Sequence, residues 1–278
     1  MLALPRGGVL WDLTLGDGGH AAMVIEGSEG RLVGLDRDPE ALRTAGGALA
    51  PFGGRVRLER GRFGDVARLA LEGTWPAPDA VLMDIGTSTR QLLDPARGFS
   101  FSHDGPLDMR MDPESGRTAA DVVNAESPET LEAIFRDLGE ERWAGRIARA
   151  VVRRRSERPF ARTSDLAELV ARTVPGRGRH HPATRVFQAL RIHVNDELGE
   201  LKRGLDGVLG LLPEGARFGV ISFHSLEDRL VKQTFLERAQ AGDFVRVTRK
   251  AVRAEREEEV VNPRSRSARF RVIRREAA

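Results

Sequence analysis

Two features near the start of the sequence could together bind a nucleoside. Gly16, Gly18 and Gly19 follow the first apolar stretch, and Asp36 ends the second. A glycine loop lets backbone N–H groups approach a ligand, and an acid about 20 residues further on can accept hydrogen bonds from both ribose hydroxyls. The pair predicts an adenosine cofactor without distinguishing NAD from S-adenosylmethionine, although G-x-G-G departs from the dinucleotide pattern G-x-G-x-x-G. The alternative is that the glycines only turn the chain.

A further carboxylate, Asp84, ends another apolar run and is followed by Gly86. Open α/β sheets bind ligands at the carboxyl ends of their strands, so Asp84 is a candidate site residue. The loop after it, which reaches Pro113, is rich in Gly, Pro, Asp and Ser yet carries Phe99 and Phe101. Such a loop is typical of a shaped site, the alternative being a surface loop pinned by its two phenylalanines.

The basic residues are distributed unevenly. The formal net charge is only +3, and lysine occurs only at Lys202, Lys232 and Lys250, so arginine supplies nearly every cation. With no Tyr or Cys to titrate, the pI near 10.0 is weak evidence for a polyanionic partner. Residues 142–162 and 264–275 are locally dense in arginine and poor in acid. These stretches favour phosphate contacts, with solvated helix and strand faces as the alternative.

The order of apolar and helix-like segments predicts an α/β protein. Strands and helices alternate at first, then the pattern is helical from 118 to 212, and the sheet resumes at 217. The predicted strands are 8–13, 31–35, 56–59, 80–85, 217–222, 244–248 and 269–273. The predicted helices are 21–26, 39–50, 66–71, 119–124, 127–138, 140–155, 164–173, 183–212 and 229–239, with a charged loop at 251–261.

Alternation of this kind implies a parallel, doubly wound sheet, and the last two strands read as an antiparallel pair. The pattern is similar to the methyltransferase variant of the Rossmann architecture. That similarity, and not the alternation itself, implies a Rossmann-like S-adenosylmethionine-binding methyltransferase domain formed by residues 1–112 and 205–278. An inserted helical domain, 113–204, would lie over the carboxyl ends of the strands and receive the substrate.

Composition excludes several classes of protein. The chain has 278 residues, 40% of them hydrophobic and 31% charged, which is typical of a globular protein. Cys is absent, so disulfides, thiol catalysis and cysteine-based zinc sites are excluded, and the adjacent His180 and His181 do not indicate a metal site. Apolar runs are shorter than the roughly 20 residues that span a bilayer, and the first eight residues lack signal-peptide features. We expect a cytoplasmic protein without a membrane partner.

Long motifs follow one another from about Val9 to Val272. They are LTLGDGGH at 13–20, GLDRD at 34–38, DIG at 84–86 through Gln91, RGFSF at 97–101, DGPLDMRMD at 104–112, HPATR at 181–185, FQALRI at 187–192, VNDEL at 194–198, SFHSLED at 222–228 and residues 262–268. In this order the motifs resemble those of the MraW-type family of small-subunit ribosomal RNA methyltransferases. This family methylates the N4 amine of a decoding-region cytosine in 16S rRNA with S-adenosyl-L-methionine. The resemblance therefore implies small-subunit rRNA or the 30S subunit as partner, with a homodimer left open.

The resemblance also implies which residues bind the methyl donor. They are Gly18, Gly19, His20, Asp36, Phe63, Asp84 and Gln91. Gln91 and His20 rest on resemblance alone, and His20 could instead cap its own helix turn. Phe63 could stack on adenine or anchor the core.

The acceptor side follows from the chemistry of an aromatic amine. Cytosine N4 is conjugated with the ring and poorly nucleophilic, so the site must align it with the methyl group and accept a hydrogen bond from its N–H. The candidate catalytic residues are Asp84, Asp108 and His224, although His224 could simply brace the turn after its strand. The candidate substrate-binding residues are Phe99, Phe101, Asn195, Arg110, Arg185, Arg191, Arg264 and Arg266, the phenylalanines as stacking partners of a flipped base.

Four departures from the family pattern keep alternatives open. Asp17 stands where a basic residue is usual, and Thr87-Ser88-Thr89 replaces the usual Val-Ser-Ser-Pro sequence. Residues 61–65 match the family loosely, and the His-x-Pro-Val-Leu segment that normally precedes the first strand is missing. A methyltransferase acting on DNA or protein, or a catalytically weak RNA-binding assembly factor, therefore remains an alternative. A nicotinamide oxidoreductase is a third, poorly supported reading.

Overall fold

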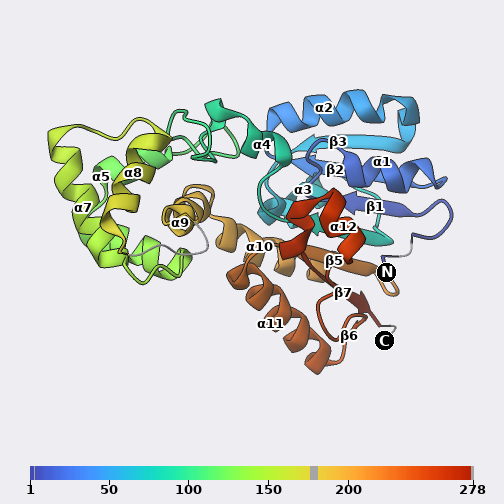
Figure 1. Cartoon of the computed structure of the whole chain (residues 1–278). Coiled ribbons are helices and arrows are strands. Elements are labelled where there is room, and N and C mark those ends of the chain that lie inside the picture. Colours follow the sequence, from blue (N-terminus) through green and yellow to red (C-terminus); the bar gives the residue numbers. More distant parts are fainter. Residues whose placement is uncertain (3, 176–180, 277–278) are drawn as a thin grey trace. The chain divides into compact units, whose positions relative to one another are not determined.

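The computed structural model describes residues 1–2, 4–175 and 181–276. It separates into two compact units (Figure 1). The sheet unit comprises Met1–Gly86 and Leu198–Ala278, and the helical unit comprises Thr87–Glu197. The helical unit is therefore inserted in the chain between the fourth and fifth strands of the sheet unit. No helix among the described residues is both long and apolar enough to span a membrane.

The sheet unit contains one seven-stranded sheet in the order β3-β2-β1-β4-β5-β7-β6. Its strands are β1 (Val9–Asp12), β2 (Arg31–Asp36), β3 (Val56–Arg60), β4 (Ala80–Asp84), β5 (Arg217–Ser222), β6 (Phe244–Arg246) and β7 (Arg269–Arg275). The first five strands are parallel, and β7 runs antiparallel between β5 and β6. This confirms the predicted Rossmann-like fold and its late antiparallel pair.

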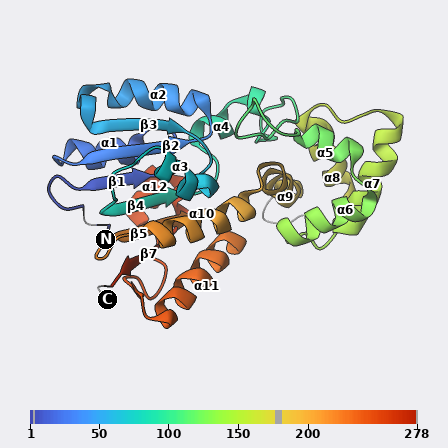
Figure 2. The same cartoon turned by 180° about the vertical axis from the view of Figure 1, so that it is seen from behind.

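Helices cover both faces of the sheet (Figure 2). Side chains alternate along each strand, so Trp11 belongs to one core cluster and Leu10 to the other. The first cluster includes α3 (Val66–Glu72), α10 (Glu197–Leu211) and α11 (Ser225–Ala241); the second includes α1 (Gly19–Glu26) and α2 (Pro39–Leu49). Burial on both faces explains the near-continuous apolar character of the central strands.

The helical unit has its own core. Its helices are α4 (Thr89–Leu93), α5 (Ala119–Ala125), α6 (Pro128–Ala133) continued by a π-turn at Ile134–Leu138, α7 (Ala144–Glu157), α8 (Thr163–Thr173) and α9 (Thr184–Asn195). The core includes Leu107, Met109 and Met111 from the long loop that follows α4. That loop is therefore packed as part of the unit.

The two units differ in their bounds from the predicted domains. The loop residues Leu107, Met109 and Met111 pack in the helical core, so the helical unit begins well before the predicted residue 113. Leu201, near the start of α10, packs in the sheet-unit core, so the helical unit ends before the predicted residue 204. Both shifts have one cause: core membership is set by three-dimensional packing, which element order alone does not reveal.

Three predicted elements were wrong in detail. The single helix expected at 183–212 is two helices, because Asp196 has the left-handed conformation with φ 49° and interrupts the helix. Part of the loop expected at 251–261 is helical, as α12 (Arg256–Val261). Helix α11 begins at Ser225, earlier than predicted, because His224 and Glu227 form a capping box at its start.

Candidate active site

Three carboxylates end three neighbouring strands of the sheet unit. Asp12 is the last residue of β1, Asp36 of β2 and Asp84 of β4, and β1 lies between the other two strands. Since these strands are parallel, the carboxylates lie along one edge of the sheet. This edge is where open α/β sheets bind ligands.

The glycine loop between β1 and α1 is tied to Asp36. The backbone N–H of Gly16 donates to Asp36 Oδ2 at 2.8 Å, and that of Asp38 donates to Oδ1 at 2.9 Å. Gly16 and Gly18 have φ of 53° and 85°, which disfavour side chains. Burial raises the pKa of Asp36, and the two backbone hydrogen bonds oppose that rise. Each carboxylate oxygen keeps further acceptor capacity for a ligand hydroxyl.

Helix α1 begins directly after this loop. Gly18 is its N-cap residue and Gly19 its first residue, so the N–H groups at the helix start are available to a ligand. His20 is exposed, and its Nδ1 lies 3.6 Å from Asp84 Oδ2. The alternative role of His20 as a cap is wrong, because the N-cap is Gly18 and no side chain makes the capping hydrogen bond. His20 instead joins the loop to the strand-end carboxylate.

Asp84 is a partly buried carboxylate with unused acceptor capacity. Its backbone N–H donates to Thr14 Oγ1 at 2.6 Å, which fixes the strand end against the glycine loop. Its Oδ1 is buried and has no hydrogen-bond partner within the described part of the chain. Burial, with a smaller contribution from Glu227, raises the pKa of Asp84 to about 7. A buried acceptor without a partner marks a place where a ligand N–H would be stabilised.

Asp12 was not among the predicted site residues. Its side chain is 1% exposed, and Oδ1 accepts a hydrogen bond from the Thr14 N–H at 3.2 Å. Burial raises the pKa of Asp12 to about 7. The sequence signal was available, since Asp12 follows the same strand-end rule as Asp36 and Asp84. The nearby carboxylates of Asp84 and Asp36 raise the pKa of Asp12 further, so the three groups interact electrostatically.

The loop after β3 is held by a second unpredicted residue, Glu200 of α10. Glu200 is 3% exposed; its Oε2 accepts the Gly64 N–H at 3.0 Å, and its Oε1 lies 2.9 Å from Arg203 Nη2 and 3.4 Å from Arg62 Nη1. These contacts fix the turn that carries Phe63. The apolar periodicity of α10 does not mark Glu200, because Leu201 and Leu205 lie roughly 100° and 140° around the helix from it.

Phe63 begins the turn at Phe63–Asp65 and is partly buried against the sheet core. A Cβ added to Gly204 of α10 would lie 2.8 Å from the Phe63 ring, so the glycine leaves room for the ring. Phe63 thus contacts the core while keeping an exposed part. Both readings of this residue are compatible with its position.

His224 has a structural role at the end of β5. Its Nδ1 accepts from the Glu227 N–H at 3.4 Å, and Glu227 Oε2 accepts from the N–H groups of His224 at 3.2 Å and Phe223 at 2.9 Å. His224 Nε2 lies 3.0 Å from Glu227 Oε1 without hydrogen-bond geometry. These contacts match the alternative interpretation, in which His224 braces the turn. A catalytic role for it stays a prediction.

Two predicted phosphate-binding arginines of the helical unit are engaged with carboxylates. Arg110 holds both oxygens of Asp108 at 2.8 and 2.7 Å, and Arg191 holds both oxygens of Glu197 at 2.8 and 2.9 Å. Bidentate pairs of this kind are strong and orient both partners. Arg110 and Arg191 therefore organise the helical unit, and Asp108 is neutralised by its neighbour.

The predicted aromatic and amide contacts also have packing roles in the helical unit. Phe99 is a core residue at 7% exposure, so its predicted stacking on a base conflicts with its burial. Phe101 is partly buried, with its ring centroid 4.6 Å from that of His181 and 4.9 Å from that of Phe187. Gln91 is 5% exposed, and its Oε1 accepts from the Ser88 N–H at 3.1 Å as part of the capping box of α4.

Asn195 braces the long loop of the helical unit. Its Oδ1 accepts from the Met111 N–H at 2.7 Å, and its Nδ2 donates to Met109 O at 2.8 Å and Arg191 O at 2.9 Å. Both amide hydrogens are therefore used within the chain, and the side chain is 5% exposed. The predicted substrate contact conflicts with this arrangement.

Replacing Asn195 with Ala should destabilise the protein by about 2–4 kcal/mol, because buried backbone groups of Met109 and Met111 lose their partners. Urea unfolding followed by circular dichroism measures the change. As a control, Asn124→Ala removes a less buried amide that bonds Phe160 and should cost less. An Asn195→Ala variant as stable as the parent would contradict the bracing role.

The remaining predicted arginines are at the surface. Arg185 is exposed and donates to Glu140 O at 2.9 Å. Arg264 and Arg266 are exposed on the turn at Pro263–Ser267. His180, one of the two adjacent histidines that do not indicate a metal site, lies outside the described residues.

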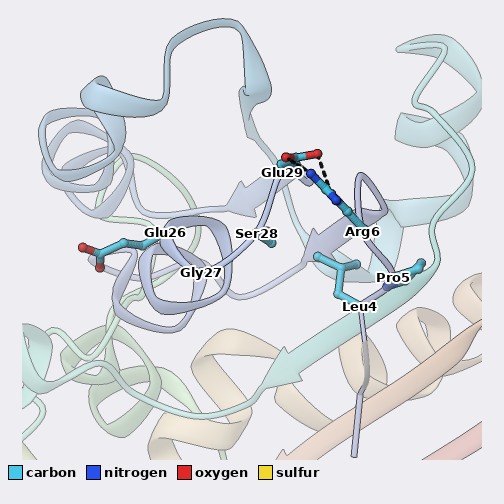
Figure 3. A pocket seen from close by; sticks show the side chains of 7 residues that line it. All are labelled: Leu4, Pro5, Arg6, Glu26, Gly27, Ser28 and Glu29. Carbon is cyan, nitrogen blue, oxygen red and sulfur yellow. Dashed lines mark hydrogen bonds and ion pairs between the residues drawn. The ribbon is translucent and has the colours of Figure 1, made fainter.

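A surface hollow of about 560 Å³ lies at the other edge of the sheet (Figure 3). It is lined by Leu4–Arg6 and Glu26–Glu29, which precede β1 and β2 and therefore lie at their amino ends. Its ion pair, Arg6–Glu29, is exposed. The hollow is thus separate from the strand-end carboxylates.

The strand-end residues fit an adenosyl sulfonium. Asp36 offers acceptors for ribose hydroxyls. Gly18 and Gly19, which lack side chains, let a ligand approach the backbone at the start of α1, and Phe63 offers an apolar ring just after β3. Asp84 contributes a buried, unpartnered acceptor to the same edge. The carboxylates at this edge also favour a cationic ligand when they are ionised.

Comparison with known proteins identifies the family. The family model described as MraW methylase family matches residues 1–276. A protein of Syntrophotalea carbinolica named ribosomal RNA small subunit methyltransferase H is 51% identical, covering 97% of this chain and 92% of the relative. The protein of the same name from Symbiobacterium thermophilum is 49% identical, covering 98% and 92%. The chain belongs to the MraW methylase family and uses S-adenosyl-L-methionine as its methyl donor.

Proposed function

We propose that the protein methylates the exocyclic N4 amine of a decoding-region cytosine in 16S rRNA. The names of the full-length relatives support small-subunit rRNA as the substrate. Asp84 supports an amine as the methyl acceptor. It lies on the sheet edge that would hold the donor, and its Oδ1 is buried without a hydrogen-bond partner among the described residues. An amine brings an N–H that this oxygen can accept.

Methyl transfer to N4 requires the nitrogen lone pair to be freed from the ring. When bound, S-adenosyl-L-methionine supplies an electrophilic methyl carbon on a positively charged sulfur. The N4 lone pair forms the new C–N bond as the C–S bond breaks and sulfur keeps its electron pair. Asp84 Oδ1 accepts the N–H and then takes the proton released from nitrogen. A pKa of about 7 suits a group that must be ionised before transfer and protonated after it.

The other residues of the sheet edge hold the donor. Asp36 accepts from the ribose hydroxyls, Gly18 lets the chain turn toward the donor, the N–H of Gly19 contacts the donor, and Phe63 packs on the adenine. His20 Nδ1, 3.6 Å from Asp84 Oδ2, orients the carboxylate. Gln91, Arg185, Arg264 and Arg266 remain proposed ligand contacts, and Asp108, His224 and Phe101 remain proposed acceptor-side residues.

Labelled S-adenosyl-L-methionine tests the proposal with small subunits and naked 16S rRNA that lack the modification. RNA digestion and mass spectrometry locate the methyl group on a nucleoside. N4-methylcytidine from the decoding region is the expected product. Transfer to DNA, to protein or to another atom of RNA would overturn the proposed acceptor. Donor binding with no transfer would favour a silent assembly factor.

Replacing Glu200 with Ala should weaken donor binding about tenfold, because a buried charged acceptor holds the loop that carries Phe63. Isothermal titration calorimetry with S-adenosylhomocysteine measures the affinity. Asp206→Ala is the matched control, since Asp206 is an exposed carboxylate on the same helix. Equal affinities for the two variants would remove Glu200 from the donor site.

A further inference from the structure

Helix α7 and its flanks carry seven arginines, which have different roles in the structure. The seven are Arg142, Arg146, Arg149, Arg153, Arg154, Arg155 and Arg158. Composition alone leaves open whether these arginines bind a partner or decorate a solvated helix. The contacts of each guanidinium decide between the two.

Two of the arginines stabilise the fold of the helical unit. Arg155 Nη1 donates to Val123 O at 2.8 Å and to Glu126 O at 2.7 Å, which closes the end of α5. Arg154 Nη1 donates to Arg158 O at 2.5 Å, and its guanidinium lies 5.5 Å from the Phe160 ring centroid. Both side chains are only partly exposed.

Four others form a continuous stripe. Arg146, Arg149 and Arg153 follow one another at intervals of three and four residues, which places them on one face of α7, and Arg142 lies in the turn that precedes the helix. All four are exposed, and none has a carboxylate partner among the residues that the structure describes. The opposite face carries Ile147, Ala148 and Val151 into the core. We call these four residues the arginine stripe.

Few acids lie near the arginine stripe. Glu157 is exposed one turn beyond Arg153, and Glu140 is exposed two residues before Arg142. Glu132 of α6 lies against Gly145 on the flank and pairs with Arg136 at 3.6 Å. Glu141 is buried and accepts from the Trp143 N–H at 2.8 Å. Most of the positive charge of the arginine stripe is therefore not neutralised by nearby carboxylates. Other surface arginines, such as Arg43, Arg136 and Arg172, are paired with acids.

We propose that the arginine stripe binds the phosphate backbone of the RNA substrate. The proposal rests on the proposed rRNA methylation and names a surface for it. At 1.5 Å per residue its helical part, from Arg146 to Arg153, is about 10 Å long, so together with Arg142 the stripe can contact several phosphates of one strand. Guanidinium groups bind phosphate bidentately. An acidic protein is a poorer match, since none of the large exposed apolar side chains belongs to α7 and protein interfaces have apolar centres.

The test replaces Arg146, Arg149 and Arg153 with Ala in the full chain. Arg142 is kept because its guanidinium lies 5.3 Å from the Trp143 ring centroid and supports packing. Loss of three phosphate contacts should reduce the slope of log affinity against log salt by about two, which is roughly 100-fold weaker binding of a 16S rRNA fragment at 0.1 M salt. Donor affinity and thermal stability should stay as in the parent.

The matched control replaces Arg43, Arg136 and Arg172 with Ala, which changes the net charge by the same amount. These arginines are exposed and pair with Glu40 at 3.6 Å, Asp137 at 2.9 Å and Glu168 at 3.5 Å. The control should lose less than fivefold in RNA affinity, because screened, paired charges contribute little.

Equal RNA affinity for the stripe variant and the control would overturn the proposal, as would weaker binding with an unchanged salt slope. Retained RNA binding together with lost binding of an acidic protein would also overturn it. Methylation of cytosine by the parent protein is scored separately. If the parent methylates rRNA and the stripe variant binds RNA with unchanged affinity, RNA binding by the arginine stripe is refuted. The proposed function is then unaffected.

Discussion

Replacing Asp84 with Asn should lower the rate of methyl transfer about 10²- to 10⁴-fold, with donor affinity changed little. The amide keeps the shape of the carboxylate but cannot take the proton from the amine. Single-turnover kinetics with saturating RNA measure the rate. Asp206→Asn, which changes an exposed carboxylate on α10 of the same unit, is the control and should react like the parent. An Asp84→Asn rate within threefold of the parent would contradict the role of Asp84.

The pH dependence of the same reaction provides a second readout. Burial raises the pKa of Asp84 to about 7, and only the ionised form accepts a proton. The rate of the parent should therefore rise tenfold per pH unit below about 7 and level off above it. The residual rate of the Asp84→Asn variant should lack this inflection. An inflection retained in the variant would point to another group.

Stability should change in the opposite direction with pH. The pKa of Asp84 in the folded protein is about 7, above the ordinary 3.8, so the fold binds this proton more tightly than the unfolded chain does. The resulting stabilisation is complete below about pH 4 and is lost as the pH rises through 7. Asp84→Asn stays neutral, so at pH 8 its melting temperature should equal or exceed that of the parent. This result would separate lost chemistry from lost folding.

Replacing Asp36 with Ala should weaken donor binding by about 100-fold or more, since two hydrogen bonds from ribose hydroxyls to a charged group are lost. The Gly16 N–H would also lose its acceptor, which loosens the glycine loop. Calorimetry with S-adenosylhomocysteine measures the loss.

Asp38→Asn is the control for that variant. It lies two residues away, and the amide can still cap α2 by accepting from the Glu40 N–H, so donor affinity should stay close to that of the parent. Similar affinities for the Asp36 and Asp38 variants would place the nucleoside elsewhere.

The sheet and its edge were predictable because strand-end residues obey local rules. Apolar runs that end in Asp36 and Asp84 predict buried parallel strands, and parallel strands bring their ends to one edge. Asp12 satisfies the same rule and could have been included. The sequence therefore contained most of the donor side of the candidate site.

The helical unit was less predictable because its contacts join residues far apart in the chain. Asn195 bonds the backbone of Met111 and Met109, which lie 84 and 86 residues away in the chain. Motif resemblance identified these residues without separating those that fold the unit from those that touch a ligand. Burial and hydrogen-bond partners make that separation, which local patterning cannot.

A crystal structure of the protein with S-adenosylhomocysteine tests the central claim most directly. We predict both ribose hydroxyls within hydrogen-bond distance of the Asp36 carboxylate and the thioether sulfur on the side of Asp84. A nucleoside bound in the hollow lined by Leu4–Arg6 and Glu26–Glu29, or one that leaves Asp36 without a contact, would contradict the account.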